Sequence, residues 1–213
     1  TCRLITEGHA LPFVTLATAP TVTLPRLKAL TTGAVPNFLD AILNLVESTD
    51  SKGGSAIEDN WLAQMRDRRG KRLTFFGDDT WLRLYADLFQ RTDGTTSFFV
   101  ADTVEVDYNV TRHVQPELAK NDWDVMILHY LGLDHIGHLA GPKSPLMLPK
   151  QREMDGVVRT IYEHTKKEDA LRLAADPTAR PTLIVLCGDH GMNEAICTEY
   201  IGNHGGSSHG EVS

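Results

Sequence analysis

The stretch Val125–His138 (VMILHYLGLDHIGH) decides the fold class of this 213-residue chain. It opens with a short apolar run typical of a buried strand and ends with an aspartate and a histidine four residues apart. A similar arrangement occurs where the apolar run Leu183–Leu186 leads to Asp189 and His190. Because ligands in α/β proteins collect at the carboxyl ends of parallel strands, these two arrangements predict a parallel sheet with a site at its edge.

The rest of the chain extends this pattern. Short apolar runs predict strands, and apolar residues at helical spacing predict helices. Further strands are expected at 73–76 and 97–100, and helices at 57–68, 81–90, 107–119 and 150–167. Alternating strands and helices indicate a largely parallel sheet covered on both faces. We therefore expect an α/β fold with one domain over residues 1–213.

Composition excludes several classes of protein. Hydrophobic residues make up 41% of the chain and charged residues 23%, as in ordinary soluble domains. The net charge of −7 argues against a nucleic-acid partner, which would demand clustered Lys and Arg. No apolar run approaches the ~18 residues of a membrane span. The first residues contain neither an initiator Met nor a signal-peptide core, so we expect an internal fragment.

The cysteines and one short motif give weaker signals. Cys2, Cys187 and Cys197 lack the spacing of a zinc finger, and Cys187 closes an apolar run, so we expect it to be buried. Asn109–Thr111 is an N-glycosylation sequon, which matters only in a lumenal or secreted chain.

The aspartate and histidine pairs predict a centre for two divalent metal ions, most simply zinc. Carboxylate and imidazole are zinc ligands, and each ion needs about three protein ligands. Asp134, His138 and His204 would hold one ion, while Asp189 and His190 would begin a second set that is one carboxylate short. Taken alone, either pair also fits a helix cap beside a surface histidine. We expect the intervening His135 to support the site from behind or to pack in the core.

A nucleophile for such a centre is offered by the segment 20–33. It is predicted to be a turn that leads into a helix ending at Gly33, where glycine relieves a left-handed cap. A hydroxyl at the start of that helix lies where backbone N–H groups favour an anion, and a bound metal ion could ionise it. Thr23 and Thr21 are both candidates, and either could instead be a simple helix cap.

These motifs resemble, in order, those of the alkaline phosphatase superfamily. The matching segments are Thr23-x-Pro25 with Thr32–Gly33, Asp134-x-x-Gly137-His138, Asp189–His190 and His204. The resemblance implies a three-layer sandwich with a largely parallel central sheet, truncated here at both ends. It also favours Thr23 over Thr21 as the nucleophile, because Thr23 keeps the superfamily's ten-residue spacing to Gly33.

Longer strings resemble a family within it, the GPI ethanolamine phosphate transferases, especially members that act on the second mannose. These strings are 20–26, 77–81, 93–100 and 129–138. The resemblance implies a lumenal domain of an endoplasmic-reticulum membrane enzyme. That enzyme would move phosphoethanolamine from phosphatidylethanolamine to a mannosylated GPI precursor through a phospho-threonine intermediate. It further implies a small membrane-protein partner subunit.

Substrate contacts are less well marked by the sequence. Arg26 and Lys28 are candidates for contact with phosphate, although bases on a helix are more often solvated. Asp78 and Asp79 are candidates for contact with the ammonium of ethanolamine, although helix capping is the commoner role of such residues.

The chain departs from the family pattern at three places. The family's first metal-binding aspartate would lie before Thr1, later strands would follow Ser213, and Ile196–Ile201 is an apparent insertion before His204. We therefore expect the isolated chain to bind fewer than two zinc ions and to show negligible transferase activity.

Two rival interpretations remain open. One is a phosphodiesterase or sulfatase of the same superfamily, although a sulfatase would need cysteine in place of Thr23. The other is an inactive fragment or pseudoenzyme. Zinc content separates the inactive fragment from the enzymes, and transfer to a mannosylated acceptor separates the transferase from a hydrolase.

Overall fold

The computed structural model describes residues 1–35, 59–194, 202–204, 206 and 209–212. Its centre is a parallel sheet of three strands, β1 (Leu73–Asp78), β2 (Arg91–Thr95) and β3 (Val125–His129), in the order β2-β1-β3. Gly77 of β1 lies opposite His129 of β3, and Asp78 lies opposite Thr95 of β2. The three strands therefore end together, and the chain leaves all of them at one edge of the sheet.

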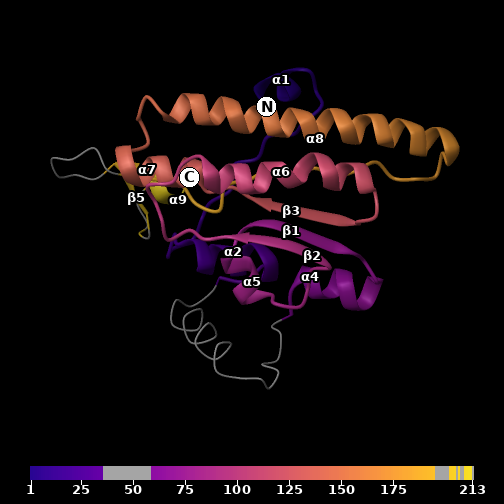
Figure 1. Ribbon diagram of the computed structural model, residues 1–213, viewed down its shortest axis with the longest axis horizontal. Coiled ribbons are helices and arrows are strands. Elements are labelled where there is room, and N and C mark those ends of the chain that lie inside the picture. Colours follow the sequence, from indigo (N-terminus) through magenta and orange to yellow (C-terminus); the bar gives the residue numbers. More distant parts are fainter. Residues whose placement is uncertain (36–58, 195–201, 205, 207–208, 213) are drawn as a thin grey trace.

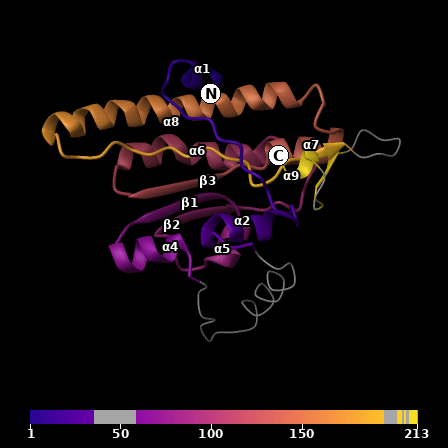
Figure 2. The same ribbon diagram turned by 180° about the vertical axis from the view of Figure 1, so that it is seen from behind.

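Helices cover both faces of this sheet, and the two opposite views agree (Figures 1 and 2). On one side lie α6 (Glu105–Lys120) and, beyond it, α8 (Met147–Ala175). On the other side lie α2 (Thr23–Thr32), α5 (Thr80–Leu84), and α4 (Trp61–Ala63) with its continuation η1 (Gln64–Arg68). The remaining short helices are α1 (Cys2–Thr6), near α8, and α9 (His209–Val212). The arrangement confirms the expected α/β fold with a parallel central sheet.

Alternating side chains on β1 explain the two layers. Phe75 is fully buried on the side of α2, α4 and α5, where its ring packs against Trp81 and Phe89. Phe76 points to the other face and stacks on His113 of α6, with ring centroids 4.4 Å apart. Successive residues of a strand face opposite sides of the sheet, so one apolar strand supplies a core to each layer.

Several predicted elements are confirmed. β1 and β3 contain the predicted strands 73–76 and 125–128, and α6 and α8 contain the predicted helices 107–119 and 150–167. The predicted end of α2 is also confirmed, because Gly33 follows it with φ of 74°. A residue with a side chain would be strained there.

Other predictions were wrong or displaced. The strand expected at 97–100 lies earlier, at β2, and Phe98 and Phe99 are exposed. The run Leu183–Leu186 is assigned to no strand, its side chains are largely exposed, and Cys187 is exposed rather than buried. A strand needs a hydrogen-bonded neighbour, and the part of the chain that the structure describes offers none to this run.

Two of the predicted helices were too long, and some of the predicted features lie outside the residues that the structure describes. The helix expected at 81–90 is only α5, and the helix expected at 57–68 begins at Trp61. Residues 57–58 and the apparent insertion at 196–201 fall outside the described residues. The sequon at Asn109 lies within α6. None of the described helices combines the length and the apolar character needed to cross a bilayer.

The first prediction concerns the core. In the protein that carries this domain, Phe75→Ala is expected to destabilise the domain by about 3–5 kcal/mol, because it leaves a cavity between the sheet and two aromatic rings. The matched control is Phe98→Ala, because Phe98 is 78% exposed. The measurement is the urea concentration at which a brief protease pulse digests half of the domain. Equal midpoints for the two variants would contradict this core.

Candidate metal centre

The first pair of candidate ligands lies on a helix that begins at the carboxyl edge of the sheet. α7 (Gly132–Ala140) starts three residues after β3 ends. Asp134 and His138 are one turn apart on this helix, so their side chains share a face. Oδ2 of Asp134 lies 3.4 Å from Nε2 of His138. The position of α7 at the edge of the sheet and the four-residue spacing therefore bring the side chains of Asp134 and His138 together.

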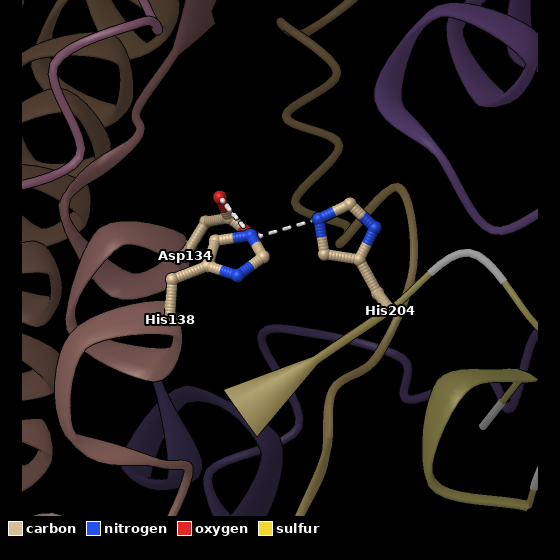
Figure 3. Close-up of side chains that lie close together, drawn as sticks. All are labelled: Asp134, His138 and His204. Atoms are coloured by element: carbon tan, nitrogen blue, oxygen red, sulfur yellow. Dashed lines mark ion pairs between the residues drawn. The ribbon is translucent and has the colours of Figure 1, made fainter. Parts of the chain in front are cut away.

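The third candidate arrives from a distant part of the sequence. His204 follows β5 (Gly202–Asn203), which pairs antiparallel with β4 (Asn193–Glu194). Its Nε2 lies 3.5 Å from Oδ1 of Asp134. Figure 3 shows the side chains of Asp134, His138 and His204 pointing toward one another. One ligand atom from each lies within 4.8 Å of the others, and we call these three residues the ligand group.

Hydrogen bonding leaves His204 with a nitrogen free to bind a metal. Its Nδ1 lies 2.7 Å from the backbone carbonyl oxygen of Thr21. A carbonyl can only accept, so Nδ1 carries the proton and donates it. In the neutral ring the lone pair is then on Nε2, the nitrogen that faces Asp134. This arrangement, a second hydrogen bond that fixes the orientation of the imidazole, is typical of metal-binding histidines.

The electrostatics of the ligand group fit a cation. Burial alone would raise the pKa of Asp134, but the hydrogen bond from His138 and the nearby imidazoles outweigh it and lower that pKa. The same hydrogen bond raises the pKa of His138. Burial, reinforced by the neighbouring His190, lowers the pKa of His204. The site thus favours the anionic form of a half-buried carboxylate and the neutral form of the His204 imidazole.

One oxygen of this carboxylate has no donor. Oδ1 of Asp134 is buried and, within the described residues, makes no hydrogen bond. An unsatisfied buried anionic oxygen is costly, and a divalent cation would remove that cost. The donor set, one carboxylate and two imidazoles with a position left open, is also that of a zinc site. The residues present therefore fit a metal ion.

The second predicted pair is only partly assembled. The ring of His190 stacks on that of His204, with centroids 3.9 Å apart, and its Nδ1 lies 2.9 Å from the carbonyl oxygen of Gly191. Nε2 of His190 is 3.4 Å from Oδ2 of Asp189. Among the residues with described positions, Asp189 does not join the ligand group. The structure therefore brings His190 beside the first set, with Asp189 as its neighbour.

The two candidate nucleophiles occupy different environments. Thr23 is the first residue of α2 and is half-buried. Thr21 is fully buried, and its hydroxyl donates to the carbonyl oxygen of Gly206 at 2.9 Å. Thr21 contacts the ligand group through its backbone, since its own carbonyl accepts from His204. Its hydroxyl would have to break an existing hydrogen bond before reacting.

The predicted substrate residues have structural partners. Arg26 and Lys28 are each only 8% exposed, so the expectation of solvated bases was wrong. Nε of Arg26 donates to the carbonyl oxygen of Asp189 at 2.9 Å, which ties α2 to the segment before His190. Asp78 accepts hydrogen bonds from the backbone and hydroxyl of Thr80 at the start of α5. This is the capping role that the sequence offered as the alternative.

Asp79 also has a partner in its own helix. Its carboxylate forms an ion pair with Arg83, four residues later, at 2.6 Å. A contact of Asp78 or Asp79 with ethanolamine, or of Arg26 with phosphate, stays a prediction.

The sequence did not reveal the packing of Met192 against α7 beside the ligand group. Gly137, inside the Asp134-x-x-Gly137-His138 motif, lies so close to Met192 that a Cβ there would be 1.9 Å from the Met192 sulfur. A side chain at position 137 would therefore force the Met192 side chain to move where the segment around β4 crosses α7. His135 is buried as expected, and its Nδ1 lies 2.6 Å from the carbonyl oxygen of Asp102. The glycine was visible in the motif, but its distant neighbour was not.

Comparisons with known proteins agree with this geometry. A family model described as Type I phosphodiesterase / nucleotide pyrophosphatase matches residues 43–204. The chain is 55% identical, over its full length, to GPI ethanolamine phosphate transferase 2 of Aspergillus fumigatus, of which it covers 26%. The proteins of that name from Candida albicans and Schizosaccharomyces pombe are 54% and 49% identical to it over 99% of the chain. The chain covers 22% and 26% of those two proteins.

These matches bear on both the extent and the class of the chain. It spans about a quarter of the length of the curated relatives it matches. The family model covers more than half of the chain and includes the whole ligand group. Together with the parallel sheet between helices, this match confirms the alkaline phosphatase-like fold class. The chain belongs to the type I phosphodiesterase / nucleotide pyrophosphatase family.

Proposed function

We propose that this chain is part of the catalytic domain of a GPI ethanolamine phosphate transferase. The complete enzyme would move phosphoethanolamine from phosphatidylethanolamine to the second mannose of a GPI precursor. The names of the similar proteins support this reaction. Within the structure, the observation that carries the proposal is the convergence of Asp134, His138 and His204 around a buried carboxylate oxygen that has no donor.

The proposal extends to the setting of the enzyme. A GPI precursor is a membrane lipid made in the endoplasmic reticulum, so we place the complete enzyme in that membrane with this domain in the lumen. A small membrane-protein partner subunit is part of the same proposal.

Two divalent metal ions, which we propose to be zinc, belong to this function. Asp134, His138 and His204 would hold one, and Asp189 with His190 would contribute to the other. When bound, such ions supply positive charge that favours an ionised hydroxyl and offsets the charge of the transferred phosphoryl group. The chain's own contribution is to keep Asp134 anionic and His204 neutral with Nε2 toward the site.

The proposed nucleophile is Thr23, at the N-terminus of α2. Its oxygen attacks the phosphorus of phosphatidylethanolamine, a Thr23–O–P bond forms, and the bond to the diacylglycerol oxygen breaks. Diacylglycerol leaves with a proton. A mannose hydroxyl then attacks the same phosphorus, the Thr23–O–P bond breaks, and the threonine regains its proton. Backbone N–H groups at the start of a helix favour the negative charge that develops there.

Hydrogen bonds within the chain connect the segments that carry the proposed nucleophile and ligands. Arg26 joins α2 to the Asp189 segment, and Thr21 joins the turn before α2 to His204. These hydrogen bonds hold the nucleophile segment and the ligand segments, which lie far apart in the sequence, in fixed positions relative to one another. Positioning of this kind contributes a large part of catalysis by phosphoryl-transfer enzymes.

One prediction tests the nucleophile. Thr23→Ala in the complete enzyme is expected to abolish the phosphoethanolamine-enzyme intermediate and to lower transfer by several orders of magnitude, since the attacking oxygen is lost. Thr23→Ser keeps an oxygen at this position and serves as the control. Mass spectrometry of the peptide containing both threonines, after a rapid quench, locates the adduct. Retention of the adduct in Thr23→Ala, or its loss in Thr21→Ala alone, would assign the role to Thr21.

A second prediction tests the ligand group. His138→Ala in the complete enzyme is expected to reduce bound zinc by one ion per molecule, because alanine supplies no donor. His9→Ala is the matched control, since His9 is exposed and its ring lies near that of Tyr162 on α8. Zinc is measured by mass spectrometry of the dialysed protein. Unchanged zinc and activity in His138→Ala would show that the ligand group is wrong.

A third prediction separates the transferase from its rivals. With labelled phosphatidylethanolamine and a mannosylated acceptor, we expect the label on the acceptor and little release to water. Release of phosphoethanolamine at the same rate with and without acceptor would identify a phosphodiesterase instead. A complete protein that holds no zinc and forms neither product would be a pseudoenzyme.

A further inference from the structure

The start of α7 is held by a side chain that belongs to neither the sheet nor the ligand group. Asp107, on α6, is completely buried. Its Oδ1 accepts hydrogen bonds from the backbone N–H groups of Leu131 and Gly132, at 3.0 and 2.9 Å. These are the capping residue and the first residue of α7. The opening N–H groups of a helix have no partner within the helix, so Asp107 acts as a cap supplied from another helix.

The second oxygen of this carboxylate faces a buried cation. Nζ of Lys150, on α8, lies 3.1 Å from Oδ2 of Asp107, and Lys150 is only 5% exposed. The same Nζ contacts Glu153, one turn further along α8. A buried charge without its partner is strongly unfavourable, so Asp107 and Lys150 each require the other. The pair therefore joins α6, α7 and α8 at one point.

The contact leaves α7 little freedom to move. A Cβ at Gly132 would lie 2.1 Å from Oδ2 of Asp107 and 3.1 Å from Cε of Lys150. The backbone of the first helical residue thus lies directly against the ion pair. Asp134 follows two residues later and His138 one turn after that, on the same rigid helix. Any displacement of the helix start is carried to both ligands.

His204 has a support besides α7. It comes from β5, which packs so closely on the middle of α7 that a Cβ on Gly202 would lie 2.5 Å from the carbonyl oxygen of Gly137, and its ring is held by the carbonyl oxygen of Thr21. The distance between its Nε2 and the carboxylate of Asp134 therefore depends both on where α7 lies and on the turn before α2. We propose that Asp107 and Lys150 are positioning residues of the metal centre, which set α7 so that Asp134 and His138 meet His204. This inference rests on the proposed metal-dependent function.

The same helix offers a matched control for a purely structural role. Glu117 of α6 is also buried, at 4% side-chain exposure, and is paired with Arg91 at 2.6 Å. It contacts β2 and the end of its own helix, and none of its recorded partners belongs to α7. Glu117→Gln removes a buried charge of the same sign from the same helix. It reports what the loss of a buried ion pair does to stability without moving α7.

The test uses the complete enzyme and measures zinc affinity by competition with a chelator, together with the protease-pulse midpoint of the zinc-free protein. Asp107→Asn keeps the Oδ1 acceptor but loses the charge that faces Lys150. We expect it to weaken zinc binding by about 10–100-fold, the usual effect of losing a group that orients metal ligands. Glu117→Gln is expected to lower the midpoint but to change zinc affinity by less than about threefold.

Variants of Lys150 provide a second test of the positioning role. Lys150→Arg, which keeps the cation, is expected to retain zinc affinity, whereas Lys150→Met is expected to lose it as Asp107→Asn does. The Lys150 variants decide the question if Asp107→Asn does not fold. Zinc affinity that is unchanged in Asp107→Asn, or lowered equally in Glu117→Gln, would overturn the positioning role alone. A wild-type enzyme that binds no zinc would overturn the metal centre itself, and this inference with it.

Discussion

The carboxylate of Asp134 is the negative charge around which the rest of the site is organised. It is half-buried, one of its oxygens is buried without a donor among the described residues, and the imidazoles of His138 and His204 face it. An anion in such a place is stable only if positive charge lies next to it. The hydrogen bond with His138 stabilises the anion in part, and a metal ion would stabilise it further. The fold must therefore bring basic or metal-bound groups to this point from several directions.

The parallel sheet positions the first two ligands, and close backbone packing positions the third. β3 delivers the chain to the carboxyl edge, where α7 begins and presents Asp134 and His138 on one face. His204 comes from the far end of the described chain, held by a carbonyl of the turn before α2. Gly202 allows the strand that leads to His204 to lie on α7, because a Cβ there would be 2.5 Å from the carbonyl oxygen of Gly137. Ligands separated in sequence by as many as seventy residues thus meet.

The sequence predicted those parts that depend on local pattern. β1 and β3 are rich in apolar residues, α2 ends at a glycine, and Asp134 and His138 are spaced for one face of a helix. Each of these signals acts within a few residues. The ligand group was predicted from the order of the motifs. Its three members lie close together in the structure, and their role as metal ligands stays a prediction.

The parts that were missed depend on tertiary contacts. β2 consists mostly of polar residues, and its Arg91 pairs with Glu117 and Asp122, so no apolar run marks it. Arg26 is buried because a backbone carbonyl 163 residues away accepts from it. Asp107 caps a helix that begins 25 residues later. No spacing rule in a single sequence reports such partners, since they are chosen by packing.

The most direct measurement is a structure of the complete enzyme with anomalous scattering recorded at the zinc absorption edge. We expect one anomalous peak at about 2.0–2.2 Å from Nε2 of His204, an imidazole nitrogen of His138 and the carboxylate of Asp134. We expect a second peak about 3.5–4 Å away, on the side of Asp189, His190 and the Thr23 hydroxyl. A zinc-supplemented protein without a peak between Asp134, His138 and His204 would contradict the proposed metal centre.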